Sequence, residues 1–285
     1  MDSYLLCTDL DRTLLPNGQA PEDSLARRRF GLVAQMPNVT LAYVTGRDIG
    51  LVEAAIAEYQ IPVPDYIISD VGASVYHSTE SGWEPDTAWH HSIAPDWQEK
   101  SWQALLPHLE HLSELTVQDN QTANACPHKL SFFTKGAIRP DELLTKVQAL
   151  LDDAGYQSRI VWSFDEGRDC GLLDVLPASA SKYHAIDFIR KQKGLEKNQC
   201  FFSGDSGNDL EVLESDIPSV LVANGTSDVR HLAIKNARTN GNSDRLYLAQ
   251  AIDDQNNGNY ASGILQGLEH YFPELYSSNP LEEIR

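Results

Sequence analysis

The first part of the chain alternates short apolar runs with a segment of helical spacing. Apolar or β-branched runs at 3–9, 40–44 and 66–69 predict three strands. Between the last two, the apolar residues of 49–59 recur at the spacing of one helix face, which predicts a helix. Strands that are apolar throughout and joined by helices predict a parallel sheet covered on both faces.

The middle of the chain has a different pattern. A predicted helix over 102–112, with its apolar residues on one stripe, precedes predicted strands at 129–133, 159–164 and 171–176. A second amphipathic helix is expected over 141–151, between the first two of these strands. Strands combined with two helices predict a small α+β sheet that carries its helices on one face.

The first pattern returns after Pro177. Helices and strands alternate again in four segments, at 183–189, at 200–202, from about Asp209, and at 219–222. The sequence therefore predicts an α/β protein whose parallel-sheet core spans 1–83 and 178–285, with an α+β domain over 84–177 inserted into it. The tail from Ser277 is expected to fray.

Charge and cysteine content narrow the class of protein. The 285 residues include 22 basic and 41 acidic side chains, a net charge of −19. Such a surface repels nucleic acid and anionic membranes, so neither is an expected partner, and any anion site must be locally positive. The cysteines, Cys7, Cys126, Cys170 and Cys200, show no metal-ligand spacing. With no apolar leader and no apolar run near about 18 residues, we expect a reduced, cytoplasmic monomer.

Polar residues follow the predicted strands where their carboxyl ends meet. Asp9 and Asp11 follow the first strand, Thr45 ends the second, and Asp205 follows the strand at 200–202. The carboxyl ends of parallel strands converge on one crevice. Carboxylates gathered there need a compensating cation, and a set of oxygen ligands favours Mg²⁺.

These residues have the chemistry for phosphoryl transfer. Asp9, at the strand end, is the predicted nucleophile and would form an aspartyl-phosphate. Asp11 would protonate the leaving oxygen and then deprotonate the attacking water, so we expect activity to fall on the alkaline side of its pH profile, as the Asp11 proton is lost. Thr45 and the backbone near Gly46 could bind phosphoryl oxygens, and Lys182, at a helix start, would supply positive charge.

Each motif also has a purely structural interpretation. The aspartate pair could be an acidic turn, Thr45-Gly46-Arg47 a strand-to-helix turn, and Lys182 a solvated lysine. Asp209 could be the N-cap of the helix that follows it. The order of the motifs, each at a strand end or a helix start, favours a catalytic site.

The four motifs resemble those of the haloacid dehalogenase (HAD) superfamily of phosphohydrolases. The matching residues are Asp9-Leu10-Asp11-Arg12-Thr13, Thr45, Lys182, and Gly204-Asp205 with Asn208-Asp209. The resemblance implies a Rossmann-like core and Mg²⁺ held by Asp9, Asp205 and the carbonyl of Asp11, with Asp209 as a further ligand. The insertion at 84–177 is similar to the C2-type cap of that superfamily, which selects the substrate.

Several other segments resemble the sucrose-6-phosphate phosphatase group of that superfamily. They are 41–47, Asp70-Val71-Gly72 with Tyr76-His77, 129–132, 173–177 and 261–265. The chain departs from this group at Ala73-Ser74, where an acidic residue is usual, and at Tyr183, where glycine usually follows the lysine.

The resemblance implies hydrolysis of a phosphorylated disaccharide, with sucrose 6-phosphate as the first choice and a sugar-phosphate synthase as a possible partner enzyme. Mannosylglycerate, glucosylglycerol and mannosylfructose phosphates are alternative substrates, and a non-catalytic sugar-phosphate binding protein or a phosphomutase is an alternative function. The expected substrate-binding residues are Thr45, Gly46, Arg47, Lys129, Asp169, Lys182 and Asn208. The tryptophans, all between 83 and 162, could stack on a sugar or fill the core.

Overall fold

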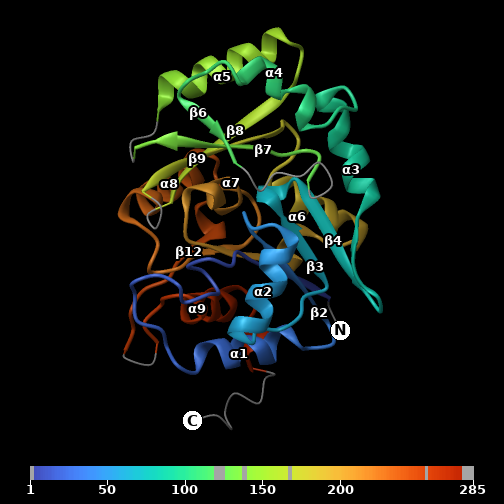
Figure 1. Ribbon diagram of the computed structural model, residues 1–285. Coiled ribbons are helices and arrows are strands. Elements are labelled where there is room, and N and C mark those ends of the chain that lie inside the picture. Colours follow the sequence, from blue (N-terminus) through green and yellow to red (C-terminus); the bar gives the residue numbers. More distant parts are fainter. Residues whose placement is uncertain (1–2, 119–125, 137–139, 166–168, 254–255, 278–285) are drawn as a thin grey trace.

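The computed structural model describes residues 3–118, 126–136, 140–165, 169–253 and 256–277. Its larger sheet, called the core sheet below, contains β1 (Tyr4–Thr8), β2 (Val39–Val44), β3 (Tyr66–Ser69), β4 (Ser74–Thr79), β5 (Gly82–Pro85), β10 (Cys200–Gly204), β11 (Ser219–Leu221) and β12 (Leu246–Leu248). The strand order is β12-β11-β10-β1-β2-β3-β4-β5 (Figure 1). Neighbours from β12 to β3 pair in parallel, which confirms the predicted α/β fold, whereas β4 and β5 add an antiparallel hairpin at one edge.

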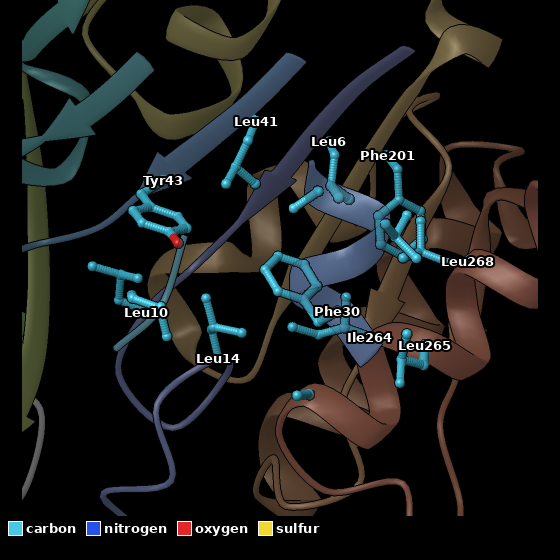
Figure 2. Packing of buried hydrophobic residues seen from close by; sticks show 14 of the residues in the cluster. Leu6, Leu10, Leu14, Phe30, Leu41, Tyr43, Phe201, Ile264, Leu265 and Leu268 are labelled. Atoms are coloured by element: carbon cyan, nitrogen blue, oxygen red, sulfur yellow. The ribbon is translucent and has the colours of Figure 1, made fainter. Parts of the chain in front are cut away.

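Helices cover both faces of the core sheet. They are α1 (Ala26–Ala34), α2 (Ile49–Tyr59), α3 (Thr87–Ile93), α6 (Lys182–Gln192), α7 (Leu210–Leu213), α8 (Ser227–Thr239), α9 (Ala261–Tyr271) and α10 (Pro273–Ser277). On one face, Phe30 of α1 and Ile264 of α9 pack against Leu6 and Phe201 of the sheet (Figure 2). Each large apolar side chain that is fully buried in this way stabilises the fold by about 1.5–3 kcal/mol. None of the helices described is both long and apolar enough to cross a bilayer.

The opposite face explains why the central strands are apolar at every position. Ile186 of α6, Val212 of α7 and Ala233 of α8 pack there with Cys7 and Phe202 of the sheet. Successive residues of a strand point to opposite faces, so a strand with helices on both sides buries all of its side chains. This packing fixes the positions of the strand ends where the polar motifs lie.

The second sheet, called the small sheet below, is antiparallel. It contains β6 (Leu115–Val117), β7 (Leu130–Lys135), β8 (Ser158–Asp165) and β9 (Cys170–Pro177), in the order β6-β7-β9-β8. Two helices, α4 (Leu106–Leu109) and α5 (Asp141–Asp153), lie on the side of this sheet that faces away from the core sheet (Figure 1). The predicted α+β unit with helices on one face is therefore present.

The prediction of one continuous helix over 102–112 was wrong. A 3₁₀ turn at Trp102–Ala104 is followed by the single-turn helix α4. Pro107 lies in the first turn of α4, where a proline is tolerated because it needs no backbone donor, and this residue favours a new helix start there. Leu105 and Leu109 are nevertheless buried, so the apolar stripe was read correctly.

The packing of α3 bears on where one domain ends and the next begins. Trp89 and Ile93 of this helix pack in the apolar cluster of the core sheet, whereas Trp97 packs in the cluster of the small sheet. The division at 83/84 and 177/178 stays a prediction, and on packing alone the first border would lie closer to Trp97. The expected fraying concerns mainly 278–285, which lie outside the described residues.

Candidate active site

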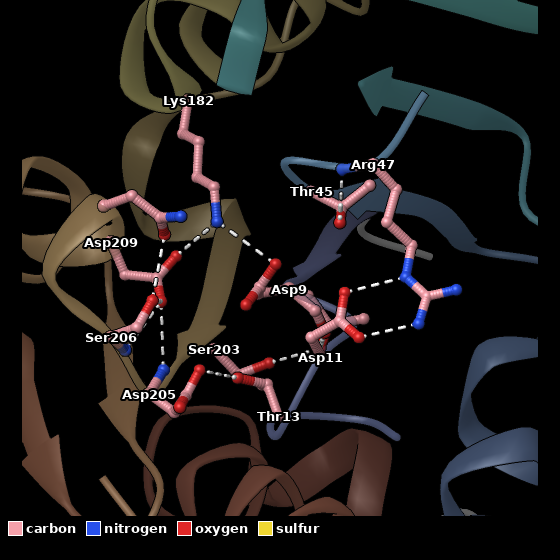
Figure 3. Close-up of polar contacts among 12 residues, drawn as sticks. Asp9, Asp11, Thr13, Thr45, Arg47, Lys182, Ser203, Asp205, Ser206 and Asp209 are labelled. Atoms are coloured by element: carbon pink, nitrogen blue, oxygen red, sulfur yellow. Dashed lines mark hydrogen bonds and ion pairs between the residues drawn. The ribbon is translucent and has the colours of Figure 1, made fainter. Parts of the chain in front are cut away.

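Asp9 lies at the carboxyl end of β1, the strand between β2 and β10. Its backbone N–H donates to the carbonyl of Ser203 at 2.9 Å, which continues the pairing of β1 with β10 by one residue. Asp9 is only 5% exposed. Its carboxylate therefore points from a rigid strand end into the crevice between the strand ends (Figure 3).

Lys182 is the first residue of α6, and Ser181 is the N-cap of that helix. The Ser181 hydroxyl accepts a hydrogen bond from the N–H of His184 at 3.1 Å. The Lys182 ammonium lies 3.1 Å from Asp9 Oδ1 and donates to Asp209 Oδ1 at 2.7 Å (Figure 3). Burial alone would lower the pKa of Lys182, but Asp209 and Asp9 outweigh it and raise this pKa, so Lys182 is a buried cation.

Asp209 organises the loop that follows β10. Its Oδ2 accepts hydrogen bonds from the backbone N–H groups of Asp205 at 3.0 Å and Ser206 at 2.9 Å, and from the Ser206 hydroxyl at 3.2 Å. A Cβ at Gly204 would lie 2.6 Å from Asp209 Cγ, so only glycine allows the carboxylate to fold back on the loop. Both oxygens of Asp209 thus already accept hydrogen bonds within the protein.

Asp205 completes a group of buried carboxylates. Asp9, Asp205 and Asp209 each offer an oxygen within 4.8 Å of the others. Burial raises the pKa of Asp205 to about 7, and the nearby Asp209 carboxylate contributes to this rise. Burial also raises the pKa of Asp9 well above its usual value, although Lys182 opposes the rise. The raised pKa values of Asp9 and Asp205 indicate that the buried carboxylates lack enough positive charge around them. Their oxygen atoms are the donors that a hard divalent cation such as Mg²⁺ prefers.

Asp11 lies in the same crevice but points toward Arg47. Arg47 donates to both Asp11 carboxylate oxygens (Figure 3). The Asn17 side chain donates to Oδ1 at 2.6 Å. Burial alone would raise the pKa of Asp11, but the hydrogen bonds and charge of Arg47 outweigh it, so the pKa is lowered. The carboxylate is therefore held in its ionised form.

The segment Thr45-Gly46-Arg47 connects β2 to α2. Thr45 is 1% exposed, and its hydroxyl accepts a hydrogen bond from the Arg47 N–H at 3.2 Å. Asp48 then caps α2 by accepting from the Leu51 N–H at 2.9 Å. The segment is thus held at both ends, with Thr45 on the strand and Asp48 on the helix.

A cavity of about 540 Å³ extends from these residues to the small sheet. Of the predicted site residues, those that line it are Asp9, Asp11, Thr45, Gly46, Arg47, Lys129, Asp205 and Asn208. Ser131, Ser163 and Asp174 of the small sheet line its other side. The volume is within the range of about 300–1,000 Å³ that small-molecule sites occupy. Lys182 contacts Asp9 but is not among the lining residues.

Other predicted residues are not brought together by the fold. Asp169 is exposed in the turn before β9, and it is absent from the described residues that line the cavity. The tryptophans are also absent from the described residues that line the cavity. Trp89 is buried in an apolar cluster of the core sheet and Trp97 in the cluster of the small sheet, against which Trp102 and Trp162 are partly buried. In this conformation no tryptophan of the described chain forms a stacking platform at the cavity.

Asp70, which also lines the cavity, was missed as a site residue. It directly follows β3 and is 4% exposed. The rule that pointed to Asp9 and Asp205, a carboxylate at the carboxyl end of a parallel strand, applies equally to Asp70. Gln118 and Cys126 also line the cavity, and no pattern in the sequence indicated them.

Comparison with known proteins gives consistent relatives. A protein of Nitrosococcus oceani, whose name assigns it only to the HAD-like hydrolases, is 40% identical over 270 residues, covering 95% of this chain and 72% of its own. The mannosylfructose-phosphate phosphatase of Agrobacterium fabrum is 28% identical over 272 residues, 94% of this chain and 96% of that protein. The glucosylglycerol-phosphate synthase of Pseudomonas anguilliseptica is 31% identical over 218 residues, which are 76% of this chain but only 26% of the synthase.

Solved structures and a family model add the fold and the family. The sucrose-phosphatase of Synechocystis, determined with sucrose and phosphate, aligns with a TM-score of 0.72 at 23% identity, over 95% of this chain and 98% of that one. Residues 2–272 match the model of the sucrose-6F-phosphate phosphohydrolase family. The chain therefore belongs to this family of HAD-superfamily phosphatases and is a phosphoric monoester hydrolase.

Proposed function

We propose that the chain is a Mg²⁺-dependent phosphatase that removes phosphate from a phosphorylated disaccharide, with sucrose 6-phosphate as the first choice, through an aspartyl-phosphate at Asp9. One observation carries the proposal. The Asp9 carboxylate lies against the buried Lys182 ammonium at 3.1 Å, at the end of a cavity that reaches the small sheet. A nucleophile, a fixed positive charge and room for a sugar thus meet at one point.

The first transfer would use Asp9 and Asp11. A carboxylate oxygen of Asp9 forms a bond to phosphorus while the bond from phosphorus to the sugar oxygen breaks, and Asp11 donates its proton to that oxygen. In the second transfer water attacks the same phosphorus, Asp11 takes the proton of the water, and the Asp9 carboxylate is released. Thr45, Gly46 and Asn208, which line the cavity, would bind the phosphoryl oxygens.

The contact between Asp11 and Arg47 must change for this sequence to begin. Asp11 is ionised while Arg47 donates to both of its oxygens, and an ionised carboxylate is a base. A phosphate is a strong bidentate acceptor for a guanidinium. We infer that the substrate phosphate takes over part of Arg47, so that the Asp11 carboxylate is released, takes up a proton from solvent and turns toward the sugar oxygen.

The carboxylates would hold the metal. HAD phosphatases generally use Mg²⁺, and the ligands proposed here are Asp9, Asp205 and the carbonyl of Asp11, with Asp209 close by. The bound ion would neutralise negative charge on the carboxylates and on the transferring phosphoryl group. Because both Asp209 oxygens accept hydrogen bonds within the protein, its main role would be to shape the loop that presents Asp205.

Relatives and cavity together support a sugar substrate. Family members act on sucrose and mannosylfructose phosphates by name, and the cavity has hydroxyl, amide and carboxylate groups on its far side in Ser131, Ser163, Gln118 and Asp174. Such groups bind sugar hydroxyls by hydrogen bonds. Mannosylfructose, glucosylglycerol and mannosylglycerate phosphates are the alternatives. A sugar-phosphate synthase is the enzyme that would supply this substrate.

Phosphate release from a panel of esters tests the proposal. The panel contains sucrose 6-phosphate, the alternative glycosyl phosphates, a phosphoserine peptide and a nucleotide, each with Mg²⁺ and with EDTA. Asp9→Asn is expected to abolish release, whereas Asp244→Asn, at an exposed aspartate whose side chain is 75% accessible, is expected to be unchanged. Preference for the peptide or the nucleotide, or full activity of Asp9→Asn, would refute the proposal. Phosphate transfer to an added acceptor sugar would identify a mutase instead.

A further inference from the structure

The segment that follows β3 has an unusual backbone. Asp70, Val71 and Gly72 have φ angles of 55°, 59° and 100°, so three successive residues lie in the left-handed region. Two of them carry a Cβ, and such conformations persist only where the surrounding structure holds them. Strain of this kind is frequently found at functional sites.

Backbone hydrogen bonds tie this segment to the loop 45–47. The Asp70 N–H donates to the Arg47 carbonyl and the Val71 N–H donates to the Thr45 carbonyl, each at 3.0 Å. These two bonds bracket Gly46. The position of the Asp70 backbone and the shape of the proposed phosphate-binding loop are therefore set together.

The other side of the segment abuts the start of α6. A Cβ at Gly72 would lie 2.3 Å from the carbonyl carbon of Ser181 and 2.7 Å from the backbone nitrogen of Lys182. The backbone of Gly72 thus lies directly against the backbone of Ser181 and of the buried Lys182. The strained segment lies between two parts of the proposed catalytic machinery.

The side chain of Asp70 faces the small sheet. Lys129, the residue before β7, has its ammonium 3.5 Å from Asp70 Oδ1, 3.5 Å from the Gly46 carbonyl oxygen and 4.0 Å from Asp174 Oδ1. The side chains of Asp70 and Lys129 are only 6% and 17% exposed. Charges at such depth interact more strongly than charges in water. Lys129 therefore links a carboxylate of the core sheet to one of the small sheet.

We propose that Asp70 is a positioning residue for the hydrolysis: through its ion pair with Lys129 it couples the placement of the small sheet over the sugar to the shape of the loop 45–47. The inference rests on the proposed function. Asp70 touches neither the phosphorus nor the nucleophile in this scheme, so its effect on the reaction passes through Lys129 and the loop. Closure over a bound sugar would then favour the loop conformation that holds the phosphate.

A second ion pair between the same two units provides a matched control. Arg159 of β8 donates to Glu211 of α7 at 2.7 and 3.3 Å. These side chains are 28% and 32% exposed, and neither belongs to the loop 45–47 or to the segment 70–72. Loss of this pair weakens the contact between the units without touching the loop.

The first test needs no substrate. Amide hydrogen exchange is measured in wild type, Asp70→Asn, Lys129→Met and Glu211→Gln, with the amides of β1 as the reference for global unfolding. The Asp70 and Lys129 variants are expected to speed exchange of the Val71 amide at least about tenfold relative to β1, and Glu211→Gln is not. Unchanged exchange at Val71 in both variants, or equal acceleration in Glu211→Gln, would overturn the proposal.

The second test is a double-mutant cycle on the reaction. With sucrose 6-phosphate, Asp70→Asn and Lys129→Met are each expected to lower kcat/KM about tenfold or more, and the double variant no further than the worse single one. With p-nitrophenyl phosphate, which is too small to reach both sheets, the loss should be smaller. Glu211→Gln should stay within about threefold of wild type.

The outcomes separate the two claims. Additive losses in the double variant would mean that Asp70 and Lys129 act independently, which overturns the coupling. A wild type that hydrolyses no sugar phosphate would refute the proposed function, and the exchange measurement would still decide whether Asp70 couples the small sheet to the loop. A variant that does not fold would be recognised by its circular dichroism, and hydrogen exchange in the remaining single variant, compared with Glu211→Gln, would then decide the proposal.

Discussion

The guanidinium of Arg47 binds both carboxylate oxygens of Asp11, with Nε–Oδ2 and Nη2–Oδ1 distances of 2.7 Å. This bidentate geometry is among the strongest that a carboxylate can form in a protein. It stabilises the ionised form of the residue that we propose as the general acid. The contact with Arg47 therefore keeps Asp11 deprotonated until the substrate binds.

Replacement of Arg47 is expected to move the pH profile. If Asp11 must be protonated in the first transfer, kcat/KM falls as pH rises through the pKa of Asp11 in the free enzyme. In wild type the pKa is lowered from an ordinary value of about 4, so kcat/KM should fall throughout the range above about pH 4. Arg47→Gln removes the two largest effects that lower the pKa and leaves the hydrogen bond from Asn17 and the charge of Lys182, so the pKa rises and the decline moves to higher pH. Measurement of kcat/KM with sucrose 6-phosphate from about pH 4 to 9 checks the shift.

Asp11→Asn is the companion variant for this profile. It is expected to reduce kcat/KM by about 10²–10⁴ and to remove the decline altogether. The overall activity of Arg47→Gln will also fall, because Arg47 lines the cavity, so the position of the decline is the deciding observation. A decline at the same pH in Arg47→Gln and wild type would contradict the assigned role of Asp11.

The buried lysine gives a prediction about stability. Lys182→Met leaves Asp9 and Asp209 buried without their shared cation, and breaking a buried pair in this way reduces stability by about 3–5 kcal/mol. Lys191 is the control, since its ammonium also lies 2.7 Å from a carboxylate, that of Asp187, but its side chain is 68% exposed. Lys191→Met should change stability by only about 0–1 kcal/mol. The free energy of unfolding is measured with urea in EDTA, and an equal loss in Lys182→Met and Lys191→Met would refute this explanation.

The raised pKa of Asp205 predicts how metal-free stability depends on pH. Folding raises this pKa from about 4 in the unfolded chain to about 7. Between these values the folded state binds more protons than the unfolded state, so this residue stabilises the fold at low pH and its contribution is lost as pH rises through about 7. In EDTA, the melting temperature of wild type relative to Asp205→Asn should therefore fall from about pH 5 to 8.

Added Mg²⁺ should reverse that trend. Carboxylates must be ionised to bind a metal, so affinity rises with pH and binding releases protons. Mg²⁺ at about 100 times its dissociation constant would stabilise the fold by about 2.7 kcal/mol. The rise in melting temperature should be larger at pH 8 than at pH 5 and should be lost in Asp205→Asn. An equal rise at both pH values would show that Mg²⁺ acts elsewhere on this acidic chain.

Much of the site follows from one topological rule, and its failures have physical reasons. Asp9, Thr45 and Asp205 could be placed together because carboxyl ends of parallel strands share one edge of the sheet. The direction of the Asp11 side chain could not, since it depends on Arg47, which lies 36 residues away in the sequence. Asp70 obeys the same rule and was still not assigned to the site, although Asp70-Val71-Gly72 was among the segments that resemble the family.

For the fold, too, repeating patterns of burial were predicted from the sequence, and local interruptions of these patterns were not. The central strands were found because burial on both faces makes them apolar throughout. The β4–β5 hairpin was not found, because β4 is buried only over its first residues and polar beyond them. The helix at 102–112 was expected as one piece because Leu105, Leu109 and Leu112 are buried and recur at helical spacing, although Pro107 starts a separate turn. Periodicity reports burial more reliably than helix continuity.

The contact of Gly72 with α6 gives a prediction with a second glycine as control. Gly72→Ala places a Cβ 2.3 Å from Ser181 at a φ of +100°, so α6 must shift and move Lys182. Gly194→Ala meets nothing within 4 Å and has a φ of +67°, so only backbone strain of about 1–2 kcal/mol is expected. Phosphate release should fall sharply in the Gly72 variant and remain near wild type in the other. Similar rates of phosphate release in both variants would mean that a shift of α6 does not reduce catalysis.

The charges that line the cavity predict a preference for uncharged sugars. Each cation among its described lining residues already faces a carboxylate: Arg12 contacts Asp205 at 3.5 Å, Arg47 contacts Asp11, and Lys129 contacts Asp70. A glycerate carboxylate on the substrate would therefore meet acidic groups and no cation that is free to bind it.

Sucrose 6-phosphate should accordingly exceed mannosylglycerate phosphate about tenfold or more in kcat/KM, because like charges in a site cost several kcal/mol. Asp174→Asn removes one carboxylate next to Lys129 and should narrow this ratio, because the lysine is then more available to the glycerate. Asp244→Asn, at the surface, should leave the ratio unchanged. A ratio near one in wild type would mean that the glycerate finds a cation after the small sheet has moved, and the pairing of Lys129 seen here would not determine which sugar is accepted.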